Sequence, residues 1–368
     1  MNGLPWGGSE ELWYRSALYA AQKGWKVGCA VYHWKEKEEK IQRLTQAGCS
    51  IYWLPNDGRS KSNLKEKIQY QLTKFRLRQF IQTLPVREYD TVVINQGGFE
   101  IFTPAWRNYW KHLDHYTLLF HNYDKNEQWG ADKQAAVKNW VSMAHLNLFA
   151  SGEIRASLQK QLSMSISNSA MLINPITITP PDYYIPYPSI ESGEYIFAMF
   201  AALETNRKAQ DHLVQALAAP QWKNRNWKLL LYGEGKDRKT LETLISQFNL
   251  AGKVILKGHT DSIANEMAKA HLILQITHKD AMPISVVEAM ALSRPVIVSD
   301  VGDMPAWVRE GVNGFVSPDA SVDSINETLE RAWQQKSSWP GMGAKSFEIF
   351  KEKYPAAVES FFLTQLGL

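Results

Sequence analysis

Residues 278–291 read HKDAMPISVVEAMA and residues 294–302 read RPVIVSDVG, and no other part of the chain says as much about its structure. The pattern predicts a loop, an apolar helix, a buried strand and a glycine turn, in that order. Pro283 suits the first turn of the helix, because its missing N–H would have no partner there. Asp280 and Glu288 lie eight positions apart, so on one helix their side chains would be roughly 80° apart around the axis. Because a helix N-terminus offers free N–H groups, this arrangement favours a phosphate or a hydroxyl-rich ligand.

A simpler interpretation of the same residues needs no ligand. Asp280 could cap the helix, and Glu288 could be a solvated acid on its surface. The full order of loop, proline, apolar helix, buried strand and glycine turn favours a binding site over this alternative.

Length and composition restrict the class of protein. The chain has 368 residues, of which 45% are hydrophobic, and this is enough for about two domains. Its net charge of +4 is too small to indicate nucleic-acid binding, but it is compatible with an anionic substrate or a lipid surface. Cys29 and Cys49 lack the spacing of metal ligands, which favours a reduced cytosolic protein. There is no signal peptide and no apolar run of about 18 residues, so we expect a cytoplasmic protein that does not span a membrane.

Short apolar runs alternate with helical patterns along the whole chain, which is typical of a parallel α/β sheet. The strands predicted from these runs are 26–32, 50–54, 91–95, 116–120, 146–150 and 171–173 in the first half, and 195–201, 228–232, 253–256, 272–276 and 295–299 in the second. Between the halves, a stretch rich in proline and tyrosine has no helical or strand period and predicts a linker.

These patterns predict two Rossmann-like domains. The first covers residues 1–175, the linker 176–193 and the second domain 194–345, and the tail 346–368 is expected to pack back on the first domain. In such sheets ligands bind beyond the carboxyl ends of the strands, so we expect the site in a cleft between the domains.

Other motifs carry residues that suit an anionic ligand. Residues 5–12 read PWGGSEEL, where paired glycines before a helix let the backbone approach a ligand, although Ser9 or Gly8 as a plain N-cap explains them equally well. In TLLFHNY (117–123), His121 directly follows a buried strand, where a satisfied core histidine is the commoner case. FAALETNRKAQDHL (200–213) and the glycine turn YGEGKD (232–237) follow predicted strands of the second half.

Together these motifs resemble the GT-B retaining glycosyltransferases of family 4, in the right order over nearly the whole chain. Residues 278–302 are similar to the family's E-G-F-P-x-x-x-x-E-A-M-A, P-V-I and G-G-x-P-E patterns, and residues 5–12 to its G-G-x-E loop. Residues 200–213 resemble its G-R-L-x-x-x-x-K-G-x-D-x-L element, and residues 232–237 its G-x-G turn. The resemblance implies two Rossmann-like domains that face each other across a cleft.

The resemblance also implies an activity, the transfer of a sugar from a nucleotide-sugar donor with retention of configuration. The residues it assigns to catalysis are His121, Asp280 and Lys208, and those it assigns to the acceptor are Glu10, Trp6 and Asn122. The residues it assigns to the donor are Gly7, Gly8, Arg207, Lys208, Gly233, Gly235, Asp280, Met282, Pro283, Ile284, Ser285 and Glu288. Glu288 would hold the ribose and Asp280 the hydroxyl groups of the sugar. The chain has no D-x-D motif, so neither a metal ion nor another cofactor is expected.

The chain departs from the family pattern at several positions. Ala202 stands where the family has an arginine for the donor pyrophosphate, and Asp280 replaces a glutamate. A hydrophobic strand normally precedes the first glycine loop, and only residues 1–4 do so here, which leads us to expect a truncated or misassigned start. These departures keep a second interpretation open, a non-catalytic GT-B subunit that binds a sugar nucleotide or a partner. A phosphorylase or epimerase is less favoured, because no pyridoxal-phosphate lysine pocket is recognisable.

The acceptor cannot be named from the sequence, which leaves a sugar, a small molecule or a lipid-linked molecule. Residues 64–82 predict a helix with one apolar stripe and one basic face. That basic face could meet an anionic membrane from the cytoplasmic side, although a charged stripe is usually just solvated.

Overall fold

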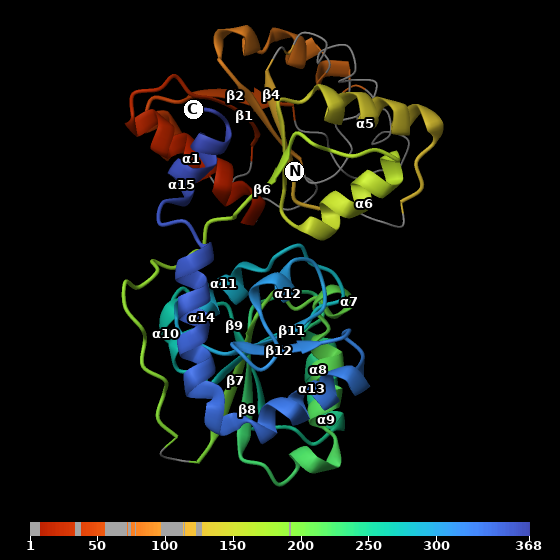
Figure 1. The fold of residues 1–368 in the computed structure, drawn as a ribbon, viewed down its shortest axis with the longest axis vertical. Helices are drawn as coiled ribbons and strands as arrows, with labels where there is room; N and C mark the ends of the chain where they lie inside the picture. The colour runs from red at the N-terminus through yellow and green to blue at the C-terminus, as the bar shows by residue number, and fades with distance from the viewer. Residues whose placement is uncertain are drawn as a thin grey trace. The chain divides into compact units, whose positions relative to one another are not determined.

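The structure is a computed structural model that describes residues 8–33, 38–55, 72, 75–77, 79–96, 113, 115–122, 127–190 and 193–368. It divides into two compact units (Figure 1), unit 1 with residues 1–175 and 356–368 and unit 2 with residues 176–355. In both units every pairing between described strands is parallel. Both units are therefore α/β structures of the class that the alternating sequence pattern predicts.

Unit 2 is built on a sheet with the strand order β12-β11-β10-β7-β8-β9. The strands are β7 (Tyr195–Phe200), β8 (Trp227–Tyr232), β9 (Val254–Gly258), β10 (Leu272–Gln275), β11 (Val296–Ser299) and β12 (Gly314–Ser317). The chain winds outward from β7 in one direction and then from β10 in the other, so the order reverses between these two neighbours. In doubly wound sheets ligands bind at the carboxyl ends of the strands beside such a reversal.

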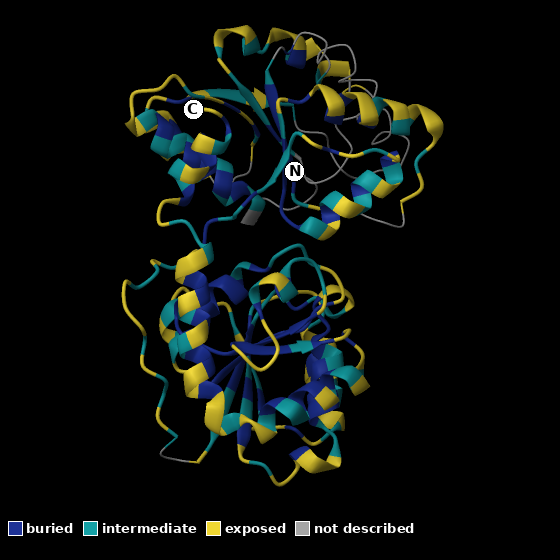
Figure 2. Ribbon diagram, in the orientation of Figure 1, coloured by how far each residue is buried: buried dark blue, intermediate teal, exposed yellow. Residues whose placement is uncertain are grey.

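Helices cover both faces of this sheet, as Figure 1 shows. On one face α8 (Gln210–Leu217), α9 (Arg238–Gln247) and α13 (Val322–Gln334) bury an aromatic and aliphatic core. On the other face α10 (Ile263–Ala268), α11 (Ile284–Ala291) and α14 (Trp339–Lys353) form a second core with the short α12 (Met304–Trp307). The central strands β10 and β11 are buried at every position, and the other strands are buried or half-buried at most positions (Figure 2), which explains why they read as apolar runs. The remaining short helices of unit 2 are α7 (Thr205–Lys208), η5 (Pro220–Trp222) and η6 (Lys336–Ser338).

Unit 1 contains two groups of described strands, a pair β1-β2 and a sheet β3-β4-β5-β6. The strands are β1 (Gly28–Tyr32), β2 (Ser50–Leu54), β3 (Val92–Gln96), β4 (Tyr116–Phe120), β5 (Leu146–Phe149) and β6 (Ser169–Met171). The helices are α1 (Gly8–Gln22), α2 (Glu38–Gln46), η2 (Val86–Glu88), α5 (Ala131–Met143), α6 (Gly152–Leu162) and α15 (Val358–Gln365). Lys26 forms an ion pair with Glu88 at 2.5 Å, and the hydroxyls of Tyr52 and Tyr89 are 3.2 Å apart. The segment that leads into β3 therefore contacts the β1-β2 pair.

The tail differs from the predicted one in where it returns to unit 1. Residues 346–353 continue α14, whose Ile349 and Phe350 belong to a core of unit 2, and only the residues after 355 belong to unit 1. There Glu359 of α15 pairs with Arg15 of α1 at 2.5 Å, and Gln365 donates to the carbonyl oxygen of Met171 at 2.9 Å.

The proline-rich stretch is packed on unit 2 instead of standing free as a linker. Arg294, only 1% exposed, donates to the carbonyl oxygens of Pro186 at 2.9 Å and Ala268 at 2.7 Å. The backbone N–H of Ile185 donates to the hydroxyl of Ser293 at 3.1 Å. The sequence pattern has no period here because these backbone groups are satisfied by side chains and not by a helix or a sheet. We call residues 176–190 the strap.

Two further elements differ from the predicted ones. The strand β12 was missed, because its short run begins with a glycine that packs on the carbonyl oxygen of Val296. Of the predicted helix 64–82, residues 64–71, 73, 74 and 78 lie outside the described residues, while Leu72 and Phe75 of its apolar stripe are 54% and 57% exposed. Among the described helices, none is both long enough and apolar enough to cross a bilayer.

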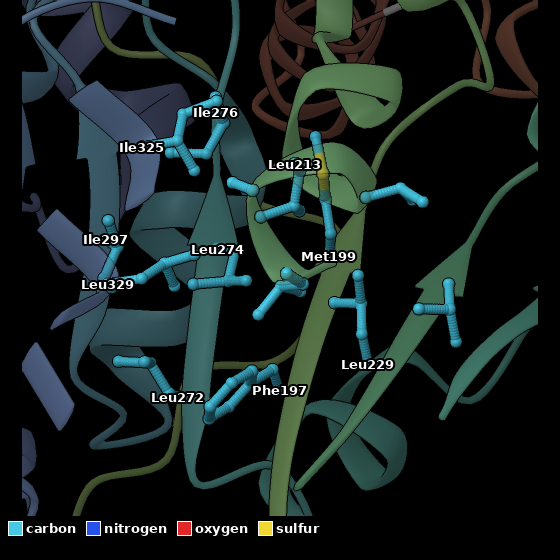
Figure 3. Packing of buried hydrophobic residues seen from close by; sticks show 14 of the residues in the cluster. Phe197, Met199, Leu213, Leu229, Leu272, Leu274, Ile276, Ile297, Ile325 and Leu329 are labelled. Atoms are coloured by element: carbon cyan, nitrogen blue, oxygen red, sulfur yellow. The ribbon is translucent and has the colours of Figure 1, made fainter. Parts of the chain in front are cut away.

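Phe197 of β7 belongs to the larger core of unit 2 (Figure 3). This ring is fully buried, and its centroid lies 6.1–6.3 Å from those of four indole rings, Trp222, Trp227, Trp333 and Trp339.

We expect Phe197→Ala to lower the free energy of unfolding of unit 2 by about 3–5 kcal/mol, because it removes this packing and leaves a cavity. Urea unfolding followed by tryptophan fluorescence measures the change. Tyr183→Ala is the control, since Tyr183 is 70% exposed and its loss should cost less than about 0.5 kcal/mol. Equal effects of the two substitutions would contradict this account of the core.

Candidate functional site

Three loops meet at the carboxyl edge of the unit 2 sheet. The carbonyl oxygen of Arg207 accepts hydrogen bonds from the Thr277 hydroxyl at 2.5 Å and the His278 N–H at 2.8 Å. This ties the loop after β7 to the loop after β10. The carbonyl oxygen of Ala281 accepts from the N–H of Asp303 at 2.8 Å, which adds the loop after β11. The predicted site residues of the two longest motifs are therefore brought together by backbone hydrogen bonds.

The side chains of Lys208 and Asp280 form an ion pair at this edge. The Lys208 ammonium contacts Oδ2 of Asp280, while Oδ1 accepts from the N–H of Ala281 at 3.0 Å. The side chain of Lys208 is only 9% exposed and that of Asp280 21% exposed. Because Asp280 lies in the loop before α11, the two carboxylates do not share a helix as their spacing suggested. The structure joins Asp280 to a cation and not to Glu288.

The neighbouring Arg207 does not take the same direction as Lys208. Its side chain is 46% exposed and pairs at 3.3 Å with Glu204, the residue that precedes α7. A change of backbone direction follows, because Ala209 adopts a left-handed conformation with φ of 47°. Lys208 is thus the buried cation of this motif, and Arg207 a half-exposed one.

The start of α11 carries a polar contact that the sequence did not reveal. Pro283 is the residue before the first helical one, with extended backbone angles, instead of standing inside the first turn. The Ser285 hydroxyl donates to Oε1 of Gln275 at 3.0 Å, and the Nε2 group of Gln275 is buried without a hydrogen-bond partner in the described structure. A buried amide donor without a partner is costly, so a water molecule or a ligand atom would have to satisfy it. Met282 and Ile284 are half-buried against the core beneath.

Glu288 is engaged by the strap. Its Oε1 accepts from the N–H of Thr177 at 2.7 Å and from the Thr177 hydroxyl at 2.5 Å, and the residue is 3% exposed. Burial raises the pKa of this carboxyl, while the hydrogen bonds from Thr177 and from the N–H of Ile178 oppose the rise. The carboxylate therefore anchors the start of the strap, and the ribose contact expected of it stays a prediction.

The glycine turn after β8 is shaped by chain packing. A Cβ on Gly233 would lie 2.0 Å from the carbonyl oxygen of Ala201, and one on Gly235 2.3 Å from that of Leu203. The N–H of Leu203 donates to the carbonyl oxygen of Glu234 at 2.9 Å. These glycines let two backbone loops touch, which is a reason for them that needs no ligand.

The predicted residues of unit 1 that the structure describes lie near the carboxyl ends of β3 and β4. Gly8 is the first residue of α1, and the carbonyl oxygen of Ser9 accepts from Nδ2 of Asn95 in β3 at 3.0 Å. Glu10, 8% exposed, accepts from the Ser9 hydroxyl at 2.7 Å. Trp6 and Gly7 lie outside the described residues.

His121 follows β4 and carries a buried ring nitrogen. Its Nε2 makes no hydrogen bond with any described residue. Burial lowers the pKa of the imidazole to about 4, so the ring is neutral at neutral pH and offers a lone pair or an N–H without a charge. Asn122, the next residue, is exposed.

Sequence reasoning missed three residues that the structure places at these edges, Asn95, Thr177 and Gln275. Asn95 and Gln275 are polar residues in the last positions of otherwise apolar strands, a signal that the sequence did contain. Thr177 gave no signal, because its role depends on a carboxylate more than a hundred positions away. No group of three His, Cys, Asp or Glu side chains in the described part of the chain has an arrangement that could hold a metal ion.

The pKa of Glu288 predicts a pH-dependent stability. A carboxyl whose pKa is raised in the folded state binds its proton more tightly there than in the unfolded chain, so folding loses stability as the pH rises above the ordinary value of 4.5. Glu288→Gln keeps an acceptor for Thr177 but carries no charge. We expect the unfolding free energy of Glu288→Gln minus that of the wild type to increase between about pH 4 and about pH 7. Urea unfolding over this range measures it, and a difference that is constant or falls would refute the assignment.

The close approach at Gly233 predicts a large effect of a single methyl group. Its φ of 134° costs an alanine about 1–3 kcal/mol, and the loop 201–203 must also move. We expect Gly233→Ala to destabilise unit 2 by at least that amount in thermal or urea unfolding. Gly341→Ala is the matched control, because Gly341 lies in α14 with open space around its Cα. There alanine should stabilise by up to about 1 kcal/mol. Two substitutions of the same sign would contradict the packing argument.

Known proteins resemble part of this chain in sequence. Residues 186–343 match the family model described as glycosyl transferases group 1. An exopolysaccharide phosphotransferase of Streptomyces coelicolor is 30% identical over 38% of this chain and 15% of its own length. A poly(glycerol-phosphate) alpha-glucosyltransferase of Bacillus subtilis is 27% identical over 34% of this chain and 19% of its own length. The matched segments thus span less than a fifth of these two relatives.

Solved structures extend the likeness to the whole chain. HepE of Anabaena, crystallised in complex with UDP, has a TM-score of 0.72 at 16% identity and covers 100% of this chain and 98% of its own. At this identity the likeness shows the fold alone, which is that of GT-B glycosyltransferases with two Rossmann-like domains, as the motifs predicted. Residues 186–343 of unit 2 thus match the glycosyl transferases group 1 model, within a chain that has the GT-B fold.

Proposed function

We propose that this protein is a glycosyltransferase that transfers a sugar from a nucleotide-sugar to an acceptor. The observation that carries the proposal is the buried Lys208, held by Asp280 at the carboxyl edge of the family-4-like unit. The departing nucleoside diphosphate gains negative charge as the glycosidic bond breaks, and a preorganised cation stabilises that charge. Since HepE was solved with UDP and with UDP-glucose, UDP-sugars are the first donors to test.

Lys208 would contact the diphosphate, and Asp280 would fix the direction of the ammonium group. An aspartate that already accepts from the N–H of Ala281 leaves the lysine little freedom to turn away. Arg207 could add a second cation, because its exposed side chain pairs only with Glu204 among the contacts of the described residues. The Nε2 group of Gln275, which has no partner in the described structure, would donate a hydrogen bond to an oxygen of the nucleotide-sugar. That bond would remove the cost of burying the amide without a partner.

Unit 1 would supply the acceptor side. A neutral His121 suits a role beside the sugar, where it would lie against the oxocarbenium-like centre without adding a positive charge. The proposal includes retention of the anomeric configuration and independence of a metal ion, both of which rest on the family resemblance.

A non-catalytic sugar-nucleotide binding subunit is the alternative. It is favoured by Ala202, which leaves one cation fewer at the diphosphate than the family pattern has, and by the neutralisation of Lys208 through Asp280. The two proposals differ in turnover and not in binding.

Binding of UDP tests the donor site. We expect UDP to bind unit 2 of the intact protein, and Lys208→Ala to weaken it at least tenfold, about 1.4 kcal/mol. Isothermal titration calorimetry measures this, and Lys239→Ala on the exposed side of α9 is the matched control. If the Lys208→Ala variant binds UDP as tightly as the wild type, the diphosphate does not contact Lys208 and the proposed donor site is wrong.

Turnover tests the activity itself. Hydrolysis or transfer of UDP-sugars, followed by release of UDP with and without EDTA, separates an enzyme from a binding subunit and tests metal independence. Nuclear magnetic resonance of the product gives its anomeric configuration. His121→Ala should lower the rate while leaving UDP affinity unchanged, because His121 belongs to unit 1. UDP binding without any turnover would favour the binding subunit.

A further inference from the structure

A hollow of about 300 Å³ lies at the carboxyl ends of β1 and β2 in unit 1. It is lined by His33, Glu38, Ile41, Gln42, Thr45, Gln46 and Trp53. His33 directly follows β1, and Trp53 is near the end of β2. In the parallel pairing Trp53 lies opposite Val31, which is buried, so both side chains lie on the same face of the pair.

One side of the hollow is a stripe of α2. Its residues stand at positions 38, 41, 42, 45 and 46, which is the spacing of one helix face. Ile41 is buried and forms the base, whereas Glu38, Gln42 and Gln46 are exposed. Their side chains form no hydrogen bond with any residue that the structure describes. The stripe therefore presents two amides and one carboxylate to the hollow.

The opposite side is aromatic. The indole of Trp53 is 44% exposed, and the ring of His33 lies 5.3 Å from it at an interplanar angle of 55°. Packing of the core does not account for this tryptophan, because nearly half of it remains accessible. An indole face is apolar and rigid, and it loses little entropy when a ligand packs on it.

We propose that this hollow binds one sugar residue of a carbohydrate acceptor. A pyranose ring has a face of C–H groups that packs on an indole, and hydroxyls around its rim that need donors and acceptors. Trp53 offers the first, and Gln42, Gln46 and Glu38 offer the second. Its volume is at the lower end of the range for small-molecule pockets, roughly 300–1,000 Å³, which suits a single sugar ring. This inference rests on the proposed function, since it concerns the acceptor of the proposed transfer.

Binding of sugars to the full-length protein tests the inference without any turnover. The probes are the methyl glycosides of glucose, galactose, mannose and N-acetylglucosamine, observed by saturation-transfer difference nuclear magnetic resonance. We expect at least one of them to receive saturation from the wild type, and Trp53→Ala to weaken its binding at least tenfold. Gln42→Ala should weaken it less. Trp25→Ala is the matched control, because Trp25 in the same unit is 42% exposed and outside the hollow.

Two variants separate this inference from the proposed function. Lys208→Ala should weaken UDP binding at least tenfold but leave glycoside binding intact, whereas Trp53→Ala should weaken glycoside binding at least tenfold and leave UDP binding intact. The inference is overturned if no glycoside binds the wild type, or if UDP displaces the glycoside and Trp53→Ala binds it normally. It is also overturned if Trp53→Ala changes only the sedimentation coefficient, since the hollow would then be a contact between two copies of the chain. Circular dichroism establishes that each variant is folded.

Discussion

The carboxyl edge of the unit 2 sheet depends on two backbone carbonyl groups, those of Arg207 and Ala281. Each accepts a hydrogen bond from a loop that follows a different strand, so the loops after β7, β10 and β11 are held in one arrangement. The ion pair of Lys208 and Asp280 follows from this arrangement, because its two residues belong to two of these loops. The hydrogen bonds from the N–H groups of His278 and Asp303 do not depend on side chains, whereas the third is donated by the Thr277 hydroxyl.

The strap imposes a second constraint on the same unit. Glu288 and Arg294 are both almost wholly buried, yet neither is paired with an opposite charge in the hydrogen bonds of the described structure. The strap supplies Thr177 to the carboxylate and the carbonyl oxygens of Ile185 and Pro186 to the guanidinium. The carbonyl oxygens of Ala268 and Ser293, outside the strap, also accept from Arg294. Removal of the strap would take away the Thr177 donors of Glu288 and two of the acceptors of Arg294, and buried polar groups that lose their partners cost more than the lost contacts themselves. The motif that first suggested a ligand site is thus also the part of unit 2 that fastens residues 176–190.

Much of this fold could be predicted from the sequence, because parallel strands buried on both faces produce apolar runs that need no tertiary information. The strands 50–54 and 116–120 have the predicted bounds, and most others differ by one or two residues. The sequence pattern could not predict which partner a polar residue bonds when that partner lies far away in the sequence. The spacing of Asp280 and Glu288 suggested one helix face, but the loop before α11 ends only at Pro283, so the two acids have different partners. The strap was taken for a linker for the same reason, since irregular backbone looks alike whether it is solvated or bonded to buried side chains.

Asp280 shows how a single methylene can change the state of a site. Its short side chain bonds the N–H of Ala281 through one oxygen and the Lys208 ammonium through the other, so the carboxylate is fixed to its own loop. A longer glutamate would place its oxygens farther from that N–H and have more freedom to reach past the lysine. With aspartate at position 280, the Lys208 ammonium is held in one direction, whereas a glutamate there would be free to move. For an anionic ligand the pair lowers the net attraction, because the lysine charge is already balanced, but it lowers the entropy that the lysine loses on binding. An anionic ligand at this edge would therefore be selected by geometry more than by charge, because the loop backbone fixes where the lysine and the aspartate stand.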